Sequence, residues 1–313
     1  MMMRETGDRS PGALRFHRHH EEIAAEAFAR PATPITAPAS VTRLSIAFDA
    51  GESQHDLAAD HLAEICRRVG SDPPPRRARH FVLETPDWTL IWERHTEFVS
   101  FTIVTPGDPD LSWSKTALDA IDSDWLSRFP GEVVSATHVA LRLTDDLDMA
   151  MDLARTAFGQ DDFTGMKSAH MPVAVAADFK PDANGFVRMI AFCRENEPSY
   201  NGRLVQRLLE IDFYRLAALL SLPVARSLLR DVRRLEDDLT TLLKSMSGHR
   251  SHTQDAENLD RLSEIAARIE QLEHDSRYRF DAGNAYYQIV RERIERLRES
   301  RIEGRQRLST FME

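Results

Sequence analysis

The sequence predicts an α+β fold, in which a mainly antiparallel sheet with flanking helices is followed by a long antiparallel coiled-coil-like helical hairpin. Two patterns lead to this prediction. Before residue 200, short β-rich segments alternate with short amphipathic segments, whereas after it apolar residues recur every three or four positions over two long runs. Residues 1–40 are polar and then rich in Pro and Ala, which is typical of irregular structure. We therefore expect a lead-in at 1–40, a head domain at 41–199 and a helical hairpin at 200–313.

The expected strands of the head domain are rich in β-branched and aromatic residues. They lie at 41–48, 80–84, 89–95, 97–104, 138–143, 172–179 and 185–193. Amphipathic spacing and flanking Gly and Pro residues predict helices at 53–69, 116–129 and 147–158, with a further short helix near 21–28. Because strands that neighbour in sequence alternate with short helices, we expect the helices to lie on one face of the sheet.

The hairpin is predicted from an apolar seam with steps of three and four residues. The first run comprises Val224, Leu228, Val232, Leu235, Leu239, Leu242 and Met246, and the second begins with Leu259, Leu262, Ile265, Ile269 and Leu272. A short polar connection with Gly248 lies between them, so the two arms, 200–246 and 256–302, must fold back antiparallel, with a kink at Pro223 in the first. Further apolar residues lie outside the seam, namely Leu219, Leu220, Leu229 and Leu243. They predict a homo-oligomer formed through the hairpin or, alternatively, a bundle in which the hairpin packs on the head domain.

The overall charge excludes some classes of function. The net charge of −10 leaves no excess positive charge to displace counterions from phosphates, which argues against a general nucleic-acid-binding protein. Residues 200–313 are close to neutral, so the acidic excess lies in the first 199 residues. Cys66 and Cys193 lack the spacing of a metal site and indicate small core residues in a reducing compartment. No apolar run reaches the roughly 18 residues needed to cross a bilayer, so we expect the chain as given to be cytoplasmic.

Common catalytic and nucleotide-binding motifs are missing, and we expect no cofactor and no metal. The densest polar cluster contains Glu93, His95 and Glu97, which would share one face of a strand and could support general acid–base chemistry. The same alternation suits a half-solvated sheet. His17, His19 and His20 could bind a transition metal incidentally, but they lie in the irregular lead-in.

Charged and amide side chains on the first helix of the hairpin are a second candidate site, which we expect to bind a ligand or to contact the head domain. This set comprises Arg203, Gln206, Arg207, Glu210, Asp212 and Arg215, at spacings that allow hydrogen bonds and ion pairs within the helix. Such a helix could dock the hairpin onto the head or form a ligand-responsive hinge beside Pro223. Near the end of the chain, Arg residues outnumber acidic ones, which suits either a solvated helix face or a surface against anionic headgroups. The candidate membrane-proximal residues are Arg296, Arg298, Arg301, Arg305 and Arg307.

Several blocks of the sequence resemble the bacterial predicted membrane-anchored proteins grouped as domain of unknown function 3422. The blocks are RHTEF at 94–98, GRLVQRLLEIDFYR at 202–215, the following AALLSLPVA, and RFDAGNAY at 279–286. The similarity covers nearly all of the chain from Glu26, and the block at 202–215 is its most specific part. Members often have E-x-H-A-R-P where this chain reads EAFARP at 26–31, so Phe28 replaces a histidine.

The resemblance implies two membrane-spanning helices beyond Glu313, so that this chain would be the cytosolic part of an inner-membrane protein with the arginine-rich run next to the membrane. It implies no reaction. We therefore expect a non-enzymatic module that binds or senses through its head and couples through its hairpin to the membrane or to sister subunits. Two alternatives stay open: the soluble domain of an ion channel or transporter, and an enzyme centred on Glu93, His95 and Glu97.

Overall fold

The computed structural model describes residues 16–20, 23, 31–48, 52–159, 163–246 and 252–312. The chain forms two compact units, residues 1–31 and residues 32–313. In the first unit, the backbone N–H of His19 donates a hydrogen bond to His17 Nδ1 at 3.3 Å. The helix expected at 21–28 lies, apart from Ile23, outside the described residues.

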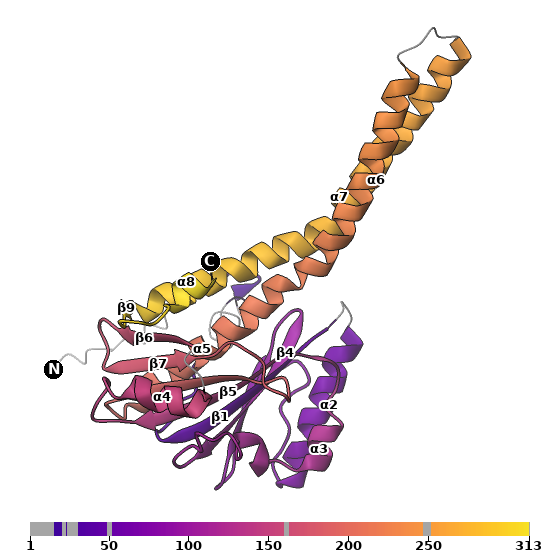
Figure 1. Ribbon diagram of the computed structural model, residues 1–313. Helices are drawn as coiled ribbons and strands as arrows, with labels where there is room; N and C mark the ends of the chain where they lie inside the picture. The colour runs from indigo at the N-terminus through magenta and orange to yellow at the C-terminus, as the bar shows by residue number, and fades with distance from the viewer. Residues whose placement is uncertain are drawn as a thin grey trace, which may run out of the picture. The chain divides into compact units, whose positions relative to one another are not determined.

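A nine-stranded sheet in the order β2-β3-β4-β1-β5-β8-β7-β6-β9 forms the centre of the described structure (Figure 1). Its strands are β1 (Ala39–Ala47), β2 (His80–Glu84), β3 (Thr89–Arg94), β4 (Phe98–Pro106), β5 (Val133–Leu143), β6 (Thr164–Ser168), β7 (Val173–Ala177), β8 (Val187–Cys193) and β9 (Glu299–Arg301). All neighbouring strands are antiparallel except β5 and β8, which run parallel. The predicted α+β class with a mainly antiparallel sheet is confirmed.

The sheet consists of two halves with the same order of elements, namely a strand, a helix and three antiparallel strands. The first half is β1, α2 (Glu52–Arg68) and β2–β4, and the second is β5, α4 (Ala150–Phe158) and β6–β8. The leading strands β1 and β5 pair with each other at the centre. In the sequence, the short helices η1 (Ala117–Ala120) and α3 (Ser123–Ser127) lie between the two halves.

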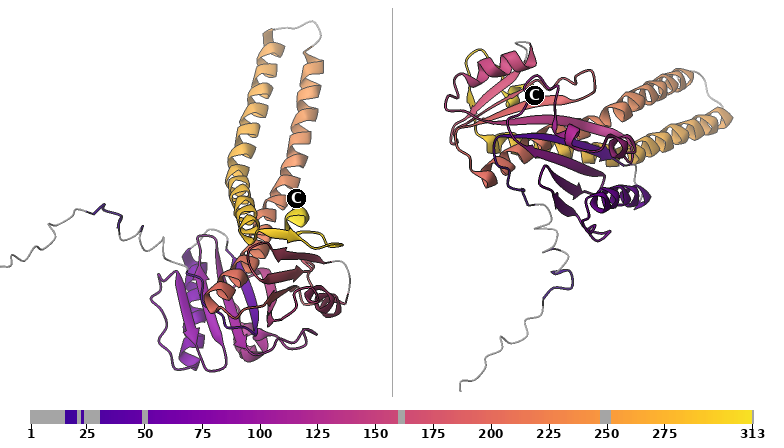
Figure 2. Two further views of the ribbon diagram at one scale, coloured as in Figure 1. Left: turned by 90° about the vertical axis from the view of Figure 1, so that its left-hand side faces the viewer. Right: turned by 90° about the horizontal axis from the view of Figure 1, so that it is seen from below.

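Helices cover both faces of the sheet. Alternate residues of each strand point to opposite sides, and apolar residues on both sides are buried under helices. On one face, α2 and α3 pack against the first half and α4 against the second. On the other face lie α5 (Pro198–Leu219), the end of α7 (His252–Leu297) and α8 (Leu308–Met312) (Figure 2). In β8, for example, Ile190 belongs to the cluster around α4 whereas Met189 belongs to the cluster around α5. The expectation that the helices lie on one face is therefore wrong.

Several element boundaries differ from the expected ones for local reasons. The helix expected at 116–129 is split into η1 and α3, because Ile121 is extended and the Asp122 side chain accepts the backbone N–H of Asp124 as a new N-cap. The strand expected at 138–143 begins at Val133. The sequence pattern did not predict β6 or β9, since both are short and lack a run of β-branched or aromatic residues.

The long helical arm after residue 200 is interrupted at Leu220, where α5 ends and α6 (Ser221–Ser245) begins. The expected kink at Pro223 thus lies three residues earlier than its proline. Proline has no N–H to donate, and its ring clashes with the carbonyl group four residues before it, which here belongs to Leu219. α6 and α7 then run side by side in opposite directions, away from the sheet and back to it (Figures 1 and 2).

The seam between α6 and α7 is only partly buried. Leu242 is buried, and Val224, Leu228, Leu235 and Leu239 are half-buried. Three residues expected in the seam are exposed, with exposed fractions of 38% for Val232, 64% for Leu259 and 52% for Ile269. The two helices therefore form a hairpin, while a regular coiled coil stays a prediction.

Both ends of the hairpin belong to the core beneath the sheet. Leu204, Leu208 and Ile211 of α5 and Val290 and Ile294 of α7 are buried in one cluster with β1, β5, β7 and β8. β9 then adds to the sheet edge beside β6, and Leu308 of α8 is buried in the same cluster. Residues 32–313, which include the expected boundary at residue 199, therefore form one compact unit.

The start of α5 is fixed by residues 33–38, which run beside it. The backbone N–H of Ile35 donates to Pro198 O at 2.9 Å, and the Asn196 side chain exchanges two hydrogen bonds with the backbone of Ala37, both at 2.9 Å. Gly202 lies against this segment so closely that an added Cβ would be 2.0 Å from Thr33 O. A side chain at residue 202 thus cannot be accommodated without moving a backbone.

Replacing Gly202 by Ala is expected to lower the free energy of unfolding by about 2 kcal/mol, because overpacking against backbone outweighs the better helix propensity of Ala. Chemical denaturation measures this. The matched comparison is Gly283→Ala in α7, where an added Cβ would be 3.2 Å from Ala218 O and a smaller loss than at Gly202 is expected. Equal stability of the Gly202 variant and the wild type would contradict the close approach.

Candidate functional site

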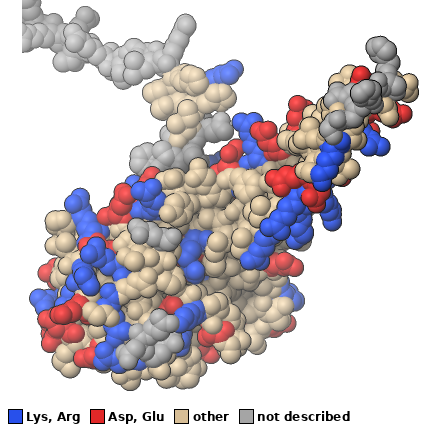
Figure 3. Space-filling view, turned by 45° about the horizontal axis from the view of Figure 1, so that its top comes forward, with Lys and Arg blue, Asp and Glu red and all other residues tan. Residues whose placement is uncertain are grey.

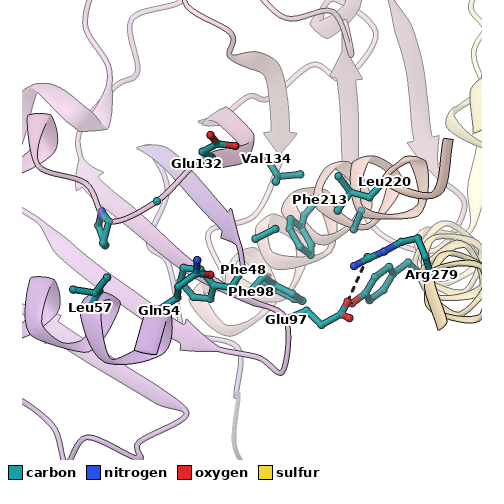
Figure 4. Close-up of a pocket in the computed structure, with 15 residues that line it drawn as sticks. Phe48, Gln54, Leu57, Glu97, Phe98, Glu132, Val134, Phe213, Leu220 and Arg279 are labelled. Atoms are coloured by element: carbon teal, nitrogen blue, oxygen red, sulfur yellow. Dashed lines mark hydrogen bonds and ion pairs between the residues drawn. The ribbon is translucent and has the colours of Figure 1, made fainter. Parts of the chain in front are cut away.

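The turn between β3 and β4 joins the sheet to the hairpin. Its last residue, Glu97, accepts hydrogen bonds from the hydroxyl groups of Tyr278 and Tyr286 on α7. Arg279 Nη1 lies 3.8 Å from Glu97 Oε2, and the ion pair is drawn in Figure 4. One carboxylate of the sheet is thus held by three side chains of one helix. We call these four residues the Glu97 joint.

Aromatic stacking extends the joint to α5. The His95 ring stacks on Phe98 with centroids 3.9 Å apart, and Phe98 packs against Phe213 of α5 at 4.0 Å. Tyr214 of α5 in turn packs against Tyr286 of α7 at 5.6 Å. The joint therefore connects the sheet to both helices at the point where the hairpin leaves it.

Burial and hydrogen bonding act in opposite directions on the Glu97 carboxyl. Desolvation alone would raise its pKa, but the hydroxyl groups of Tyr278 and Tyr286 and the guanidinium of Arg279 hold the pKa below its ordinary value. Burial and, next, the hydrogen bond to the Glu97 carboxylate raise the pKa of Tyr286. Glu97 is therefore an ionised hydrogen-bond acceptor at neutral pH.

A cavity of about 560 Å³ opens beside the joint, between the ends of β1, β4 and β5 and the helices α5 and α7 (Figure 4). Its apolar lining includes Phe48, Leu57, Phe98, Val134, Phe213 and Leu220, and its polar lining is formed by Gln54, Glu97, Glu132 and Arg279. Gln54 Oε1 is buried and has no hydrogen-bond partner among the described residues. The lining is polar and apolar in similar measure, and the volume lies within the range of small-molecule sites.

The three candidate catalytic residues do not lie on one strand, because β3 ends at Arg94 and the chain turns before β4 begins at Phe98. Glu93 is buried under α5, where it accepts a hydrogen bond from Arg43 Nη2 at 2.5 Å and from Ser100 Oγ at 3.3 Å. His95 and Glu97 lie in the turn. The expected shared strand face is therefore wrong, and each of the three side chains is engaged in a different contact.

The candidate residues on α5 face two different partners. Asp212 is buried and accepts hydrogen bonds from Thr137 Oγ1 at 2.7 Å, Ser135 Oγ at 3.1 Å and Arg215 Nη2 at 2.9 Å. The expected Asp212–Arg215 pair is thus present. Glu210 pairs with Arg293 of α7. These contacts dock α5 onto the sheet and onto α7.

The basic residues expected near a membrane lie at the sheet end of the hairpin. Arg296 is near the end of α7, Arg301 belongs to β9 at the sheet edge, and Arg305 lies over the Phe163 ring at 4.0 Å from its centroid. Arg298 Nη1 is 3.4 Å from His170 Nε2. Arg307 is exposed between β9 and α8. The chain thus brings this set back to the sheet rather than to the tip of the hairpin.

The described residues contain neither a metal-binding cluster nor a helix that could span a bilayer. No group of three or more His, Cys, Asp or Glu side chains in the described ranges could hold a metal ion. Among the same residues, no helix is both long enough and apolar enough to span a bilayer. The two cysteines are buried, and burial raises the pKa of both thiols.

Comparison with known proteins defines the family. The model of the family described as "Protein of unknown function (DUF3422)" matches residues 15–313. The chain belongs to the DUF3422 family. Neither the curated proteins nor the solved structures contain a match to this chain.

Two DUF3422-like blocks of the sequence meet at the Glu97 joint. Glu97 belongs to the RHTEF block, and Arg279 and Tyr286 belong to the RFDAGNAY block. The sequence pattern indicated Glu97 as a candidate but did not predict its partners Tyr278, Arg279 and Tyr286. The only sequence feature that linked Glu97 to these partners was the resemblance of both blocks to one family. Their large separation in the chain did not indicate a contact.

The coupling between Glu97 and Tyr286 is expected to be about 1.5 kcal/mol in a double-mutant cycle of Glu97→Gln and Tyr286→Phe, because a hydrogen bond to a carboxylate is worth more than a neutral one. Denaturation of the four proteins at pH 7 measures it. Tyr287→Phe is the control, since this neighbouring residue is 40% exposed.

The same coupling is expected to fade in acid. Because the folded-state pKa of Glu97 is lower than the ordinary 4.5, its contribution to stability is complete above pH 4.5 and is lost as the pH falls through the folded-state value. A coupling energy near zero at pH 7, or one that grows in acid, would show that Glu97 does not hold α7.

Proposed function

We propose that this chain is a non-enzymatic coupling module, in which the Glu97 joint holds the sheet and the hairpin together and the hairpin pairs with that of a second copy. The joint supports the coupling part, since it links the turn after β3 to α5 and α7 through side chains. An enzymatic role receives less support, because Glu93 is committed to Arg43 and Glu97 to two tyrosines and an arginine.

The observation that carries self-association is an exposed apolar stripe on α6. Leu222, Leu229 and Leu243 are 40%, 58% and 56% exposed and lie at multiples of seven residues, with Glu236 at the intervening position. Val232, 38% exposed, lies three residues after Leu229. Heptad spacing is the pattern by which one helix packs against another. Val224, Leu228, Leu235 and Leu242 are more buried than this second stripe, so the stripe is the apolar part of α6 that a partner could cover.

Charges beside the stripe favour a second copy in the antiparallel direction. The part of α6 nearer the sheet carries Arg226, Arg230, Arg233 and Arg234 with one acidic residue, Asp231, and the next turn carries Glu236, Asp237 and Asp238. Figure 3 shows Lys and Arg side chains gathered along the part of the hairpin nearest the sheet domain. An antiparallel pair with two-fold symmetry places the basic segment of each copy against the acidic segment of the other, whereas a parallel pair opposes like charges.

Sedimentation velocity over a range of concentrations tests the pairing. The wild type is expected to form a dimer, and Leu229→Glu with Leu243→Glu is expected to weaken it at least tenfold, because two charges enter the apolar contact. Thr241→Glu, an exposed position on the same helix, is the matched control and should leave the dimer unchanged. A wild type that stays a monomer at all concentrations would refute self-association.

Charge reversal tests the direction. In the antiparallel pair, Arg233→Glu with Arg234→Glu is expected to weaken the dimer by opposing like charges, and adding Glu236→Arg and Asp237→Arg to the same chain should restore it. In a parallel pair, Arg233 and Arg234 of one copy would face the same residues of the other copy. Replacing all of them by Glu would exchange a repulsion between positive charges for one between negative charges, so no weakening is expected.

We also propose that the module acts on the cytosolic side of a bacterial inner membrane as part of an anchored protein. The support is the sequence resemblance described above. Fractionation of cells that express the natural gene product tests it: recovery in the membrane fraction after a salt wash is expected, and recovery in the soluble fraction would contradict it.

A further inference from the structure

Two arginines face each other across the antiparallel pair of α5 and α7. The contact between Glu210 of α5 and Arg293 of α7 sets the alignment of the two helices. Since antiparallel helices advance in opposite directions, one turn back along α5 and one turn forward along α7 bring Arg207 beside Arg296. Arg203 lies one further turn along α5. This register places Arg203 and Arg207 of α5 on the same side of the helix pair as Arg293 and Arg296 of α7.

The nearby carboxylates form ion pairs with three of these four arginines, namely Arg293, Arg296 and Arg203. Glu210 pairs with Arg293, Glu292 lies 3.5 Å from Arg296, and Glu197 lies 3.9 Å from Arg203. Within the described ranges, no carboxylate lies within 4 Å of Arg207, the central member. Three carboxylates thus accompany four guanidinium groups, and the excess positive charge is at Arg207.

Burial and repulsion both act against the charge of Arg207. Partial burial is the largest influence and lowers its pKa; Tyr200 raises the pKa, and the like charges of Arg296, Arg203 and Arg293 lower it. A chain that placed arginines here only for solubility would gain nothing from bringing them together, since like charges on facing helical positions are destabilising. The arrangement becomes favourable when an anion lies between them.

We propose that Arg203, Arg207, Arg293 and Arg296 form a binding site for a phosphate group, either free phosphate or the headgroup of an anionic lipid. Guanidinium groups bind phosphate oxygens through two parallel hydrogen bonds, and a tetrahedral phosphate has enough oxygens to accept from several arginines at once. A carboxylate, with two oxygens, satisfies fewer of them. The site lies on the outer surface of α5 and α7 and involves no residue of the Glu97 joint.

Calorimetric titration with inorganic phosphate at low ionic strength tests the site directly. The wild type is expected to bind phosphate, and Arg207→Gln is expected to bind it at least tenfold more weakly, because the central guanidinium is lost. Arg268→Gln is the matched control, since it removes one exposed arginine from the distal part of α7 and should bind as the wild type does. Phosphate should raise the unfolding midpoint of the wild type and of this control but not of Arg207→Gln.

A vesicle arm separates the two sources of phosphate. Cosedimentation uses vesicles of phosphatidylcholine with about one third phosphatidylglycerol, and pure phosphatidylcholine as the reference. Binding to the anionic vesicles that Arg207→Gln abolishes and Arg268→Gln retains identifies a lipid headgroup, whereas phosphate binding alone identifies the free anion. The proposal is overturned if the wild type binds neither probe, or if Arg207→Gln and Arg268→Gln lose binding equally. Arg207→Gln removes a repulsion, so a folded variant is expected, and its unfolding midpoint without phosphate verifies this.

Discussion

The Glu97 carboxylate is the interaction on which the arrangement of the hairpin depends. It lies at the end of a turn of the sheet, and its three partners all come from one stretch of α7. Both tyrosine hydroxyls and the Arg279 guanidinium stabilise the ionised form of Glu97. Glu97 is therefore the acceptor and the three side chains of α7 are the donors, which restricts the geometry of the contact. Because α6 and α7 support each other, holding α7 at this point also sets the direction in which the whole hairpin leaves the sheet.

Buried polar pairs determine how α5 lies on the sheet. Asp212 accepts from Ser135 and Thr137 of β5, and the Arg43–Glu93 pair lies on the same face of β1 and β3. A displaced α5 would take the buried Asp212 carboxylate away from both hydroxyl donors of β5 and leave it with Arg215 alone, which costs more than a shifted apolar contact. The apolar residues of α5 thus supply the driving force for docking, while Asp212 selects one position. Gly202 fixes the other end, where α5 touches the backbone of residue 33.

Local patterns predicted the elements but not the way they meet. The β-branched segments, the long helical runs and the turn at Gly185 each follow from residues close in sequence, and the structure contains them. β6 and β9 escaped prediction because their residues pair with distant strands and carry no pattern of their own. The Glu97 joint escaped for the same reason, since about 180 residues separate the carboxylate from its tyrosines. The second face of the sheet is covered by helices because the hairpin returns to the sheet, and the periodicity of its apolar residues does not indicate that return.

The most direct test of this account is the distance between the sheet domain and the hairpin, measured by double electron–electron resonance. Spin labels at Asp152→Cys on α4 and Glu264→Cys on α7 report it, both positions being exposed, while Cys66 and Cys193 are buried and react poorly. Dilution with unlabelled protein keeps the measurement within one chain. The account predicts a narrow distance distribution in the wild type that broadens in Glu97→Gln. An equally narrow, unchanged distribution in Glu97→Gln would contradict the claim that this carboxylate holds the hairpin.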